Sequence, residues 1–390
     1  MTVRLAKLCE VCDVNPRLPR THGLLDDDEV SFVPMAAVSE VSGSIESASV
    51  RRFADVKKGY TSFADGDVLF AKITPCMENG KAALAHGLAG GRGFGSTEFH
   101  VLRGGESVLP EWLYYFVRRE SFRREAKRTF TGTAGQQRVP AAFLENAAIP
   151  VPSLTEQRRT IDLLARANGI IRLCRDAQSK AAELIPAIFI DMFGDPATKP
   201  NSWPISKFGE IGALDRGKSR HRPRDAAALY GGPYPFIQTG DVANSGGRIR
   251  RHTATYSDSG LAQSKLWRAG TLCITIAANI AKTGVLEFDA CFPDSVVGFV
   301  PGDRVRVGYV QAWLGFLQPT LEANAPQAAQ KNINLEILRA LPIPVPPIDQ
   351  QDAFVDRCER VLSIERQQAA ALASSQAAFD ALLARAFSED

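Results

Sequence analysis

The chain has 390 residues, of which 45% are hydrophobic and 23% charged, as in an ordinary soluble globular protein of two to three domains. No apolar run reaches the ~18 residues of a membrane helix, the first residues lack a secretory apolar core, and seven scattered cysteines argue against a disulfide framework. We therefore expect a cytoplasmic protein without membrane contact. The net charge is only +3, but residues 203–346 carry 16 basic and 11 acidic side chains, which favours a polyanionic partner.

The first half of the chain is predicted to form a β-rich domain that ends in a helix. Residues 30–35, 67–73 and 99–102 are short strand-like runs, and clusters of Gly, Pro, Asn and Ser separate them. Residues 111–117 are predicted to be helical. The prolines of Ile149-Pro150-Val151-Pro152 then force an extended exit, because proline cannot donate a hydrogen bond and restrains the residue before it.

A long helical connector follows, and the same succession then occurs again. Pro186 is expected to kink the first connector near its end. In the second half, the strand-like runs are 235–238, 271–276 and 296–300, and a helix is predicted over 309–314. The second connector runs from Asp349 to about Phe387 without Pro or Gly.

A repeated phrase shows that the two halves are copies of each other. Residues 149–157 recur as residues 343–351, and this offset of 194 holds without a gap through the connectors, so that Phe193 corresponds to Phe387. A repeat of this length is a duplicated domain with its connector. The predicted fold is α+β, with two β-rich domains in a pseudo-two-fold repeat joined by two long antiparallel, coiled-coil-like helices. The predicted boundaries are 1–152, 153–200, 201–346 and 347–390.

Apolar residues recur along both connectors at the 3-4 spacing of a heptad seam, with several polar interruptions. We favour an antiparallel helix pair, because no other element is long enough to pack along either connector; the alternative is a core helix of a bundle. The residues of this seam that are predicted to form the partner interface are Ile161, Leu164, Ile171, Ile185, Val355, Leu362, Leu372, Phe379 and Leu383.

No constellation for catalysis is found in the sequence. Asp65, Asp67 and Lys72 lie close together as a nuclease would require, but Asp65-Gly66-Asp67 is more typical of a turn entering a strand. The matching segment of the second half, Ala269-Gly270-Thr271, has neither carboxylate. The five histidines have no metal-binding spacing. We therefore predict no catalytic residue, no metal and no cofactor.

Clusters of Arg and Lys favour contact with nucleic-acid phosphates, and Arg, Gln, Asn and Thr on loops are the types that read base edges. The densest cluster opens the second domain, where residues 216–224 hold five Lys or Arg; the alternative for each cluster is a solvated surface. The predicted DNA-binding residues are Arg51, Arg52, Lys57, Lys58, Lys72, Lys81, Arg92, Arg123, Lys127, Arg216, Lys218, Arg220, Arg222, Gln238, Thr239, Arg248, Arg250, Arg251, Asn279 and Lys282.

These motifs together resemble the DNA-specificity subunit of type I restriction–modification systems. The most specific are the two copies of Ile-Pro-Val-Pro leading into a long helix, supported by residues 73–81, 95–99 and 234–242. The resemblance covers nearly the whole chain. It implies two target-recognition domains, each reading one half of a split site in double-stranded DNA. It also implies a non-catalytic subunit whose helices dock two modification (methyltransferase) subunits, which restriction (nuclease–translocase) subunits join.

Two alternatives stay open from the sequence. An adaptor or specificity subunit of a related phage-defence system would share every motif described above. A stand-alone nuclease or DNA methyltransferase would instead show activity as the purified chain, given magnesium or a methyl donor. The DNA target and its spacer length do not follow from the sequence, because recognition depends on the geometry of loops.

Overall fold

The structure is a computed structural model that describes residues 4–19, 21–133, 135–196, 199–200, 203–277, 280–323 and 333–388. By its internal contacts the chain divides into two compact units. Unit 1 comprises residues 1–176 and 369–390, and unit 2 comprises residues 177–368. Each unit is therefore built from one β-rich region and from parts of both connectors.

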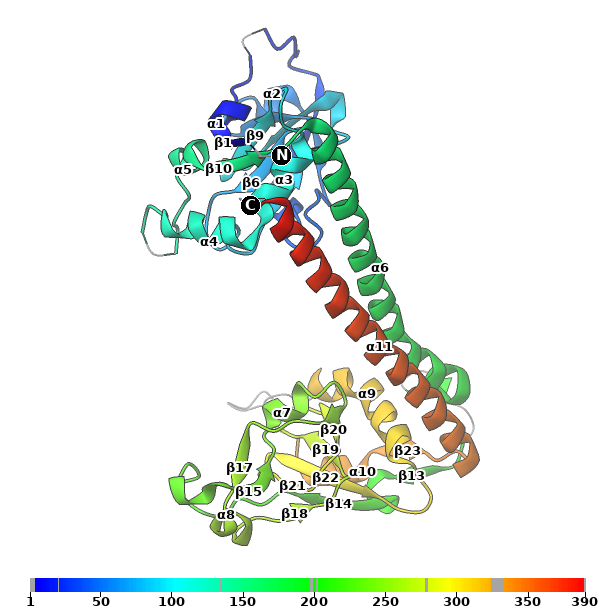
Figure 1. Ribbon diagram of the computed structural model, residues 1–390. Helices are drawn as coiled ribbons and strands as arrows, with labels where there is room; N and C mark the ends of the chain where they lie inside the picture. Colours follow the sequence, from blue (N-terminus) through cyan, green and yellow to red (C-terminus); the bar gives the residue numbers. More distant parts are fainter. Residues whose placement is uncertain are drawn as a thin grey trace. The chain divides into compact units, whose positions relative to one another are not determined.

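Two four-stranded sheets form the β-rich region in the described part of unit 1 (Figure 1). The first has the order β2 (Cys12–Val14), β9 (Phe99–Gly104), β6 (Val68–Ala71) and β7 (Ala82–Leu84). The second has the order β4 (Ser49–Arg52), β3 (Glu29–Val33), β8 (Arg92–Gly95) and β5 (Thr61–Ala64). Leu69 and Val101 of the first sheet share a buried cluster with Val33 and Phe63 of the second.

Short helices pack around the two sheets of unit 1. The most amphipathic are α3 and α4, and α3 begins with a proline at its first turn, where the missing N–H is not needed. The short elements and helices of this region are α1 (Leu8–Val11), a 3-10 turn (Met35–Ala37), α2 (Phe53–Val56), a 3-10 turn (Ala89–Gly91), α3 (Pro110–Arg118), α4 (Glu120–Arg128) and α5 (Ala141–Asn146).

Unit 2 has the same plan with different loops. In its described part, a five-stranded sheet has the order β14 (Gly212–Arg216), β22 (Val296–Pro301), β19 (Leu272–Thr275), β20 (Thr283–Leu286) and β16 (Arg248–Ile249). A four-stranded sheet has the order β17 (Ala254–Tyr256), β15 (Tyr230–Phe236), β21 (Ala290–Cys291) and β18 (Leu266–Trp267). Trp267, Cys273, Phe292 and Val296 join the two sheets in one buried cluster.

The remaining elements of unit 2 are mostly short. They are a small hairpin of β11 (Gly194–Asp195) and β12 (Lys199–Pro200), 3-10 turns at Phe208–Glu210 and Ala227–Leu229, and the helices α7 (Thr239–Ala243), α8 (Asp258–Ala262), α9 (Val307–Ala323) and α10 (Leu335–Ala340). The strand-like runs and helices predicted in both halves overlap β3, β6, β9, β15, β19, β22, α3 and α9, although the run at 235–238 shares only residues 235–236 with β15 and α9 is longer than predicted.

The repeated phrase forms a short strand in each unit. In unit 1, β10 (Ala148–Val151) pairs antiparallel with β1 (Arg4–Lys7), and in unit 2, β23 (Pro342–Pro344) pairs with β13 (Ile205–Lys207). These two-stranded sheets place the start of each β-rich region beside its end. Proline is tolerated in them because a strand at a sheet edge leaves some N–H groups unused.

Two long helices carry the connectors, α6 (Leu154–Phe193) and α11 (Ile348–Ala386). Ser153 and Glu156 form a capping box at the start of α6, and the helix continues through Pro186. In unit 1 the first part of α6 packs against the last part of α11, and in unit 2 the last part of α6 packs against the first part of α11 (Figure 1). The helices are thus antiparallel. No helix among the described residues is long and apolar enough to cross a membrane.

Candidate nucleic-acid interface

A groove in unit 2 brings several of the predicted DNA-binding residues together. We call this cavity of about 590 Å³ the unit-2 groove. Its lining is rich in amide and guanidinium groups and consists of Gln238, Gly240, Asp241, Asn244, Ser245, Arg248, Ile249, Arg250, Arg251 and Thr253. Thr239, also predicted, begins α7 beside it. Asn279 lies outside the described residues.

Local hydrogen bonds shape the unit-2 groove. Asp241 accepts a bond from the Gln238 backbone N–H at 2.8 Å and another from the Thr253 hydroxyl at 3.1 Å, which ties the start of α7 to the opposite rim. Gly246 and Gly247 have positive φ angles of 61° and 91°, a conformation that glycine adopts without strain. Their tight turn leads directly into β16 and aims Arg248, Arg250 and Arg251 from one short segment.

Carboxylates partly neutralise the arginines of the unit-2 groove. Arg248 lies 3.4 Å from Glu359 of α11, and Arg250 forms bonds of 3.0 and 3.1 Å with Glu287. Arg251 is exposed and has no hydrogen bond or ion pair with another described residue. Gln238 and Asn244 are exposed as well. The groups most available to a ligand are therefore the guanidinium of Arg251 and these two amides.

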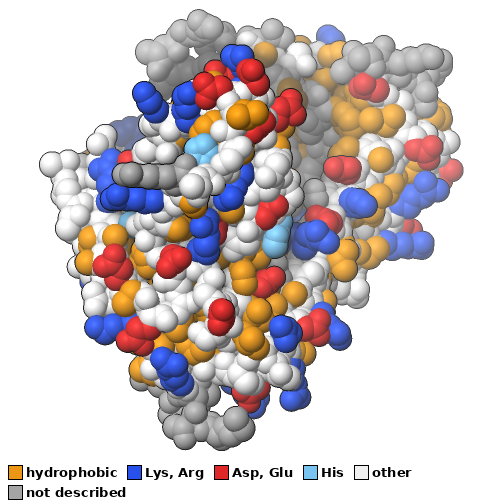
Figure 2. Space-filling model, turned by 90° about the horizontal axis from the view of Figure 1, so that it is seen from above, with side chains coloured by type: hydrophobic (Ala, Val, Ile, Leu, Met, Phe, Trp, Pro, Cys, Tyr) orange, Lys and Arg blue, Asp and Glu red, His pale blue; other side chains and the backbone are white. Residues whose placement is uncertain are grey.

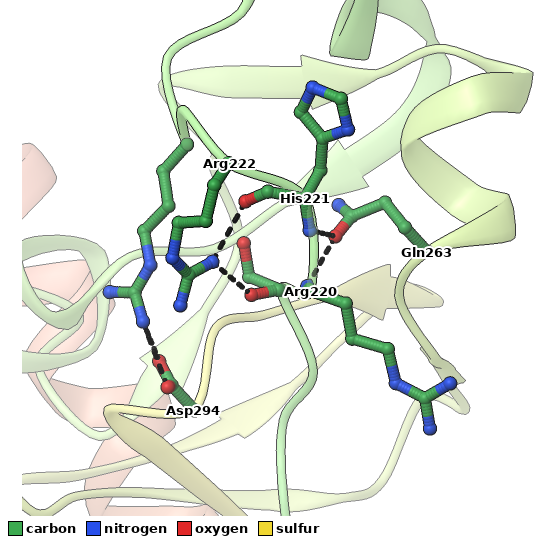
Figure 3. A network of polar contacts seen from close by, with 7 residues as sticks. Arg220, His221, Arg222, Gln263 and Asp294 are labelled. Carbon is green, nitrogen blue, oxygen red and sulfur yellow. Dashed lines mark hydrogen bonds and ion pairs between the residues drawn. The ribbon is translucent and has the colours of Figure 1, made fainter.

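The basic run at residues 216–224 is a loop held by its own bonds (Figure 3). The backbone N–H groups of Arg220 and His221 both donate to Gln263 Oε1, at 2.5 and 3.0 Å. Arg222 donates to the carbonyls of Ser219 and His221 at 2.8 Å, so its side chain stabilises the conformation of the loop. Figure 3 shows the Arg220 side chain extending away from this network.

The other cationic side chains of unit 2 differ in whether they are paired and exposed. Arg224, outside the predicted set, is neutralised by Asp294 at 2.9 Å. Lys218 and Lys282 are exposed, like Arg220, and none of these three side chains bonds to another described residue. Arg216 is half-buried at the end of β14. Exposed phosphate contacts from this loop are thus limited to Lys218, Arg220 and the outer edge of Arg222.

In unit 1, the predicted cations near β4 and α2 are mostly paired. Arg51 stacks over the ring of Phe32 at 3.7 Å, whereas Arg52 lies 3.6 Å from Asp27 and 3.5 Å from Asp55. Lys57 lies 2.7 Å from Asp26, and Lys58 is exposed without a partner among the described residues. Figure 2 shows acidic and basic side chains interspersed over the face in view, rather than a field of one sign.

Two other predicted cations of unit 1 converge on one acidic residue. Glu78 pairs with Lys127, and its backbone carbonyl accepts a bond of 2.6 Å from Arg123. Hydrogen bonds from Lys127 and then from Thr74 lower the pKa of Glu78. The remaining predicted residues, Lys72, Lys81 and Arg92, are half-buried, and the Lys81 ammonium donates to the Met35 carbonyl at 3.3 Å.

The carboxylates considered for a nuclease have structural roles. Asp67 is 1% exposed and binds Arg103 through two bonds of 2.8 and 2.6 Å. It also accepts from the Ala64 N–H at 2.8 Å, while Asp65 accepts from the Leu88 N–H at 3.0 Å. Among the described residues, no group of three or more His, Cys, Asp or Glu side chains could hold a metal ion.

The seam residues lie against the cores of the two units, and their role as partner contacts stays a prediction. Leu164, Ile171 and Leu383 are buried. Ile161 and Phe379 pack on the unit 1 core, and Ile185 and Val355 pack on the unit 2 core. Ile161, Ile185, Val355 and Phe379 are half-buried, so part of each side chain stays accessible. Leu362 and Leu372 are half-buried, and their partner role stays a prediction.

Large apolar side chains that are exposed on α6 in unit 1 are Leu163, Ile170 and Leu173.

Two glutamines, which we call the hinge glutamines, were not predicted as functional. Gln157 and Gln351 occupy the same position in the two copies of the repeated phrase and are both fully buried. Gln157 accepts from the Leu109 N–H and donates to the carbonyls of Ser107 and Pro152, at 2.8 to 2.9 Å. Gln351 makes the same three bonds, to Arg306, Arg304 and Pro346, at 2.8 to 3.0 Å. The sequence did contain a signal for their importance, because the two glutamines recur at the offset of 194.

Comparison with known proteins gives a consistent set of similarities. A family model described as "Type I restriction modification DNA specificity domain" matches residues 1–178 and 200–373. Over 181 residues the chain is 38% identical to the type I restriction enzyme EcoEI specificity subunit and 36% identical to the EcoAI specificity subunit, both from Escherichia coli. Each alignment covers 46% of this chain and 30% of the relative, so the chain spans about 30% of the length of these curated relatives.

A solved structure extends the similarity of fold to almost the whole chain. It is a chain reported in work on the complex assembly and conformational transition of the type I R-M system. The alignment has a TM-score of 0.65 and 24% identity, and covers 98% of this chain and 97% of that one. The pattern of two β-rich regions and two long helices is therefore shared with a solved protein.

Proposed function

We infer the function of this protein from its family, because the chain belongs to the type I restriction modification DNA specificity domain family. The proposed function is sequence recognition without catalysis: the chain binds a two-part target in double-stranded DNA. It directs methyltransferase subunits, and the restriction subunits that join them, to that target. Residues 1–152 and 201–346 are the proposed recognition domains, and residues 153–200 and 347–390 the proposed helical connectors.

The duplication supports a two-part target. The family model matches twice, once in each half, and each match holds a β-rich region followed by the first part of a long helix. Two copies of a DNA-reading domain can read two half-sites, as in other DNA-binding proteins whose pseudo-symmetry mirrors that of their site. The loops differ between the halves, so the two half-sites are expected to have different sequences.

The unit-2 groove is the observation that carries the proposal for base recognition. Guanidinium groups bind the O6 and N7 acceptors of guanine, and amides bind adenine N6 and N7, each with paired hydrogen bonds. Arg251, Gln238 and Asn244 present these groups from one groove and are exposed. Arg248 and Arg250 form ion pairs with Glu359 and Glu287. They would contact phosphates or bases only after these ion pairs break.

A double substitution of Gln238→Ala and Arg251→Ala is expected to relax one half of the target and leave the other half unchanged. Each lost base contact is worth about 1–3 kcal/mol of discrimination, or roughly 5- to 150-fold. The measurement is genome-wide sequencing of methylated DNA in cells that express the chain with its methyltransferase subunit. Arg268→Ala is the matched control, since Arg268 is an exposed arginine of unit 2 outside the groove. Relaxation of both halves, or of neither, would remove the groove from the recognition surface.

A further inference from the structure

A second cavity, in unit 1, is lined by arginines. We call it the arginine cleft; its volume is about 800 Å³, and α3, α4, α6 and α11 all contribute to it within the same unit. Its basic side chains are Arg118, Arg119, Arg123, Arg124 and Arg175. Glu40, Glu120 and Asp380 are the acidic residues of the described lining. The lining therefore carries an excess of positive charge.

Neutral groups, rather than carboxylates, hold the central arginines. Arg118 donates to the Tyr114 hydroxyl at 2.8 Å and to the Glu40 carbonyl at 3.2 Å. Arg119 donates to the Phe116 carbonyl at 3.2 Å, and Arg123 to the Glu78 carbonyl at 2.6 Å. These bonds fix the guanidinium planes without cancelling their charge. Arg124 differs, because it pairs with Glu120 at 2.7 Å.

Two glycines make room for these guanidinium groups. Gly43 and Gly80 have φ angles of +65° and +81°, which L side chains rarely adopt. A Cβ atom would lie 1.3 Å from Arg118 Nη1 at position 43, and 2.9 Å from Arg123 Nη1 at position 80. Each guanidinium group therefore occupies the space that a side chain at the glycine would take, and the flexible end of the arginine could move aside at small cost.

The arginines of the cleft are partly desolvated and incompletely bonded. Burial lowers the pKa of Arg123 and lowers that of Arg119 to about 10. Arg123 Nε is buried and has no hydrogen-bond partner within the described part of the chain. The bonds to carbonyl and hydroxyl oxygens leave further guanidinium N–H groups unused, and a group that brings negative charge and several acceptor oxygens would satisfy them.

We propose that the arginine cleft binds phosphate groups of the DNA backbone beside the half-site that unit 1 reads. This inference rests on the proposed function. The planar guanidinium fork matches phosphate oxygens with paired bonds. The cleft also presents Ser121 and Asn168, neutral donors of the kind that contact DNA backbones. A phosphate diester is favoured over an acidic protein segment because the lining combines guanidinium groups with the neutral donors Ser121 and Asn168.

The test is the salt dependence of DNA binding by the full chain with Arg118→Gln and Arg123→Gln together. Binding is measured between about 50 and 200 mM salt, with a duplex carrying the target and with a non-target duplex of equal length. Loss of one or two phosphate contacts should reduce the slope of log K against log[salt] by about 1–2, since each contact contributes about 0.9. Both duplexes should bind about tenfold more weakly near 100 mM salt, and their affinity ratio should stay constant.

Controls separate this role from folding and from other partners. Arg128→Gln is the matched variant, since Arg128 is an exposed arginine of α4 outside the cleft, and its slope should change less. Arg118→Lys with Arg123→Lys keeps the charge, so the slope should be largely restored; circular dichroism checks the fold of both double variants. An unchanged slope with weaker binding of the methyltransferase subunit would assign the cleft to a protein partner and overturn the proposal, as would a changed affinity ratio. If the unmodified chain did not discriminate between the duplexes, the proposed function itself would fail instead.

Discussion

Replacement of Phe387 by alanine is expected to lower the free energy of unfolding of unit 1 by about 3–5 kcal/mol. Phe387 is 4% exposed, and its ring centroid lies 4.3 Å from that of Trp112 and 5.6 Å from that of Phe116. The Arg119 guanidinium also lies over its ring, at 4.9 Å. The substitution would leave a cavity where α3 meets the end of α11, and would remove the last aromatic contact of that helix.

Urea unfolding followed by circular dichroism measures the loss, and hydrogen exchange assigns it to a unit. Unfolding in more than one step is possible for a chain with two units, so the assignment is needed. Phe193→Ala is the corresponding change in unit 2, where Phe193 packs 4.9 Å from Tyr309 and 5.4 Å from Phe354. Ile364→Ala is the control, because Ile364 is 44% exposed on α11 and should change stability by no more than about 0.5 kcal/mol. A comparable loss in the control, or faster exchange in unit 2 after the Phe387 change, would contradict the expected role.

The position of this phenylalanine gives a physical reason for the constant offset of 194. Phe193 follows Gln157 by 36 residues, and Phe387 follows Gln351 by the same number. At about 3.6 residues per turn this interval is a whole number of turns, about ten, in each connector. One inserted residue would rotate the phenylalanine by about 100° away from its pocket. The length of a loop in the β-rich regions does not set the direction of a buried side chain in this way, and the loop lengths differ between the halves.

The sequence was most informative about regular elements. Strands such as β6 and β19 were predictable because their buried runs are continuous and bounded by turn residues. The seam of the long helices was also predictable as an apolar periodicity, and Leu164, Ile171 and Leu383 are buried accordingly. The antiparallel helix pair was predicted, whereas the contact of the seam with the β-rich cores was not, because periodicity identifies a buried side of a helix and not every neighbour of it.

The state of individual cations was beyond sequence reasoning. Arg250 pairs with Glu287, and Arg248 with Glu359, across 37 and 111 positions of the chain. Such partners are created by folding, so a basic cluster in the sequence overstates the free charge in the structure. The converse also occurs: Arg118 and Arg119 lie in a run that also contains Glu120, yet their folded partners are neutral groups.

Replacement of Gln351 by methionine is expected to lower the free energy of unfolding of unit 2 by about 2–4 kcal/mol. Methionine has a similar volume, so the change removes the hydrogen bonds with little change in packing. It leaves the Arg306 N–H and the carbonyls of Arg304 and Pro346 without the amide, and a buried unsatisfied polar group costs about 1–3 kcal/mol. Gln157→Met should have the same effect in unit 1. Urea unfolding with hydrogen exchange again provides the measurement.

The neighbouring Gln350 provides the matched control. Its side chain is half-buried and makes no hydrogen bond with another described residue, so Gln350→Met should cost no more than about 0.5 kcal/mol. The two hinge substitutions lie in different units and should be additive when combined. Each hinge glutamine joins the repeated phrase to the loop before α3 or α9. Its loss should therefore also make the recognition domain less rigidly attached to the long helix that follows it. Target affinity in the double variant should then fall further than after either single change. Full stability with unchanged DNA affinity would show that the prolines of the repeated phrase hold the hinge without the amide.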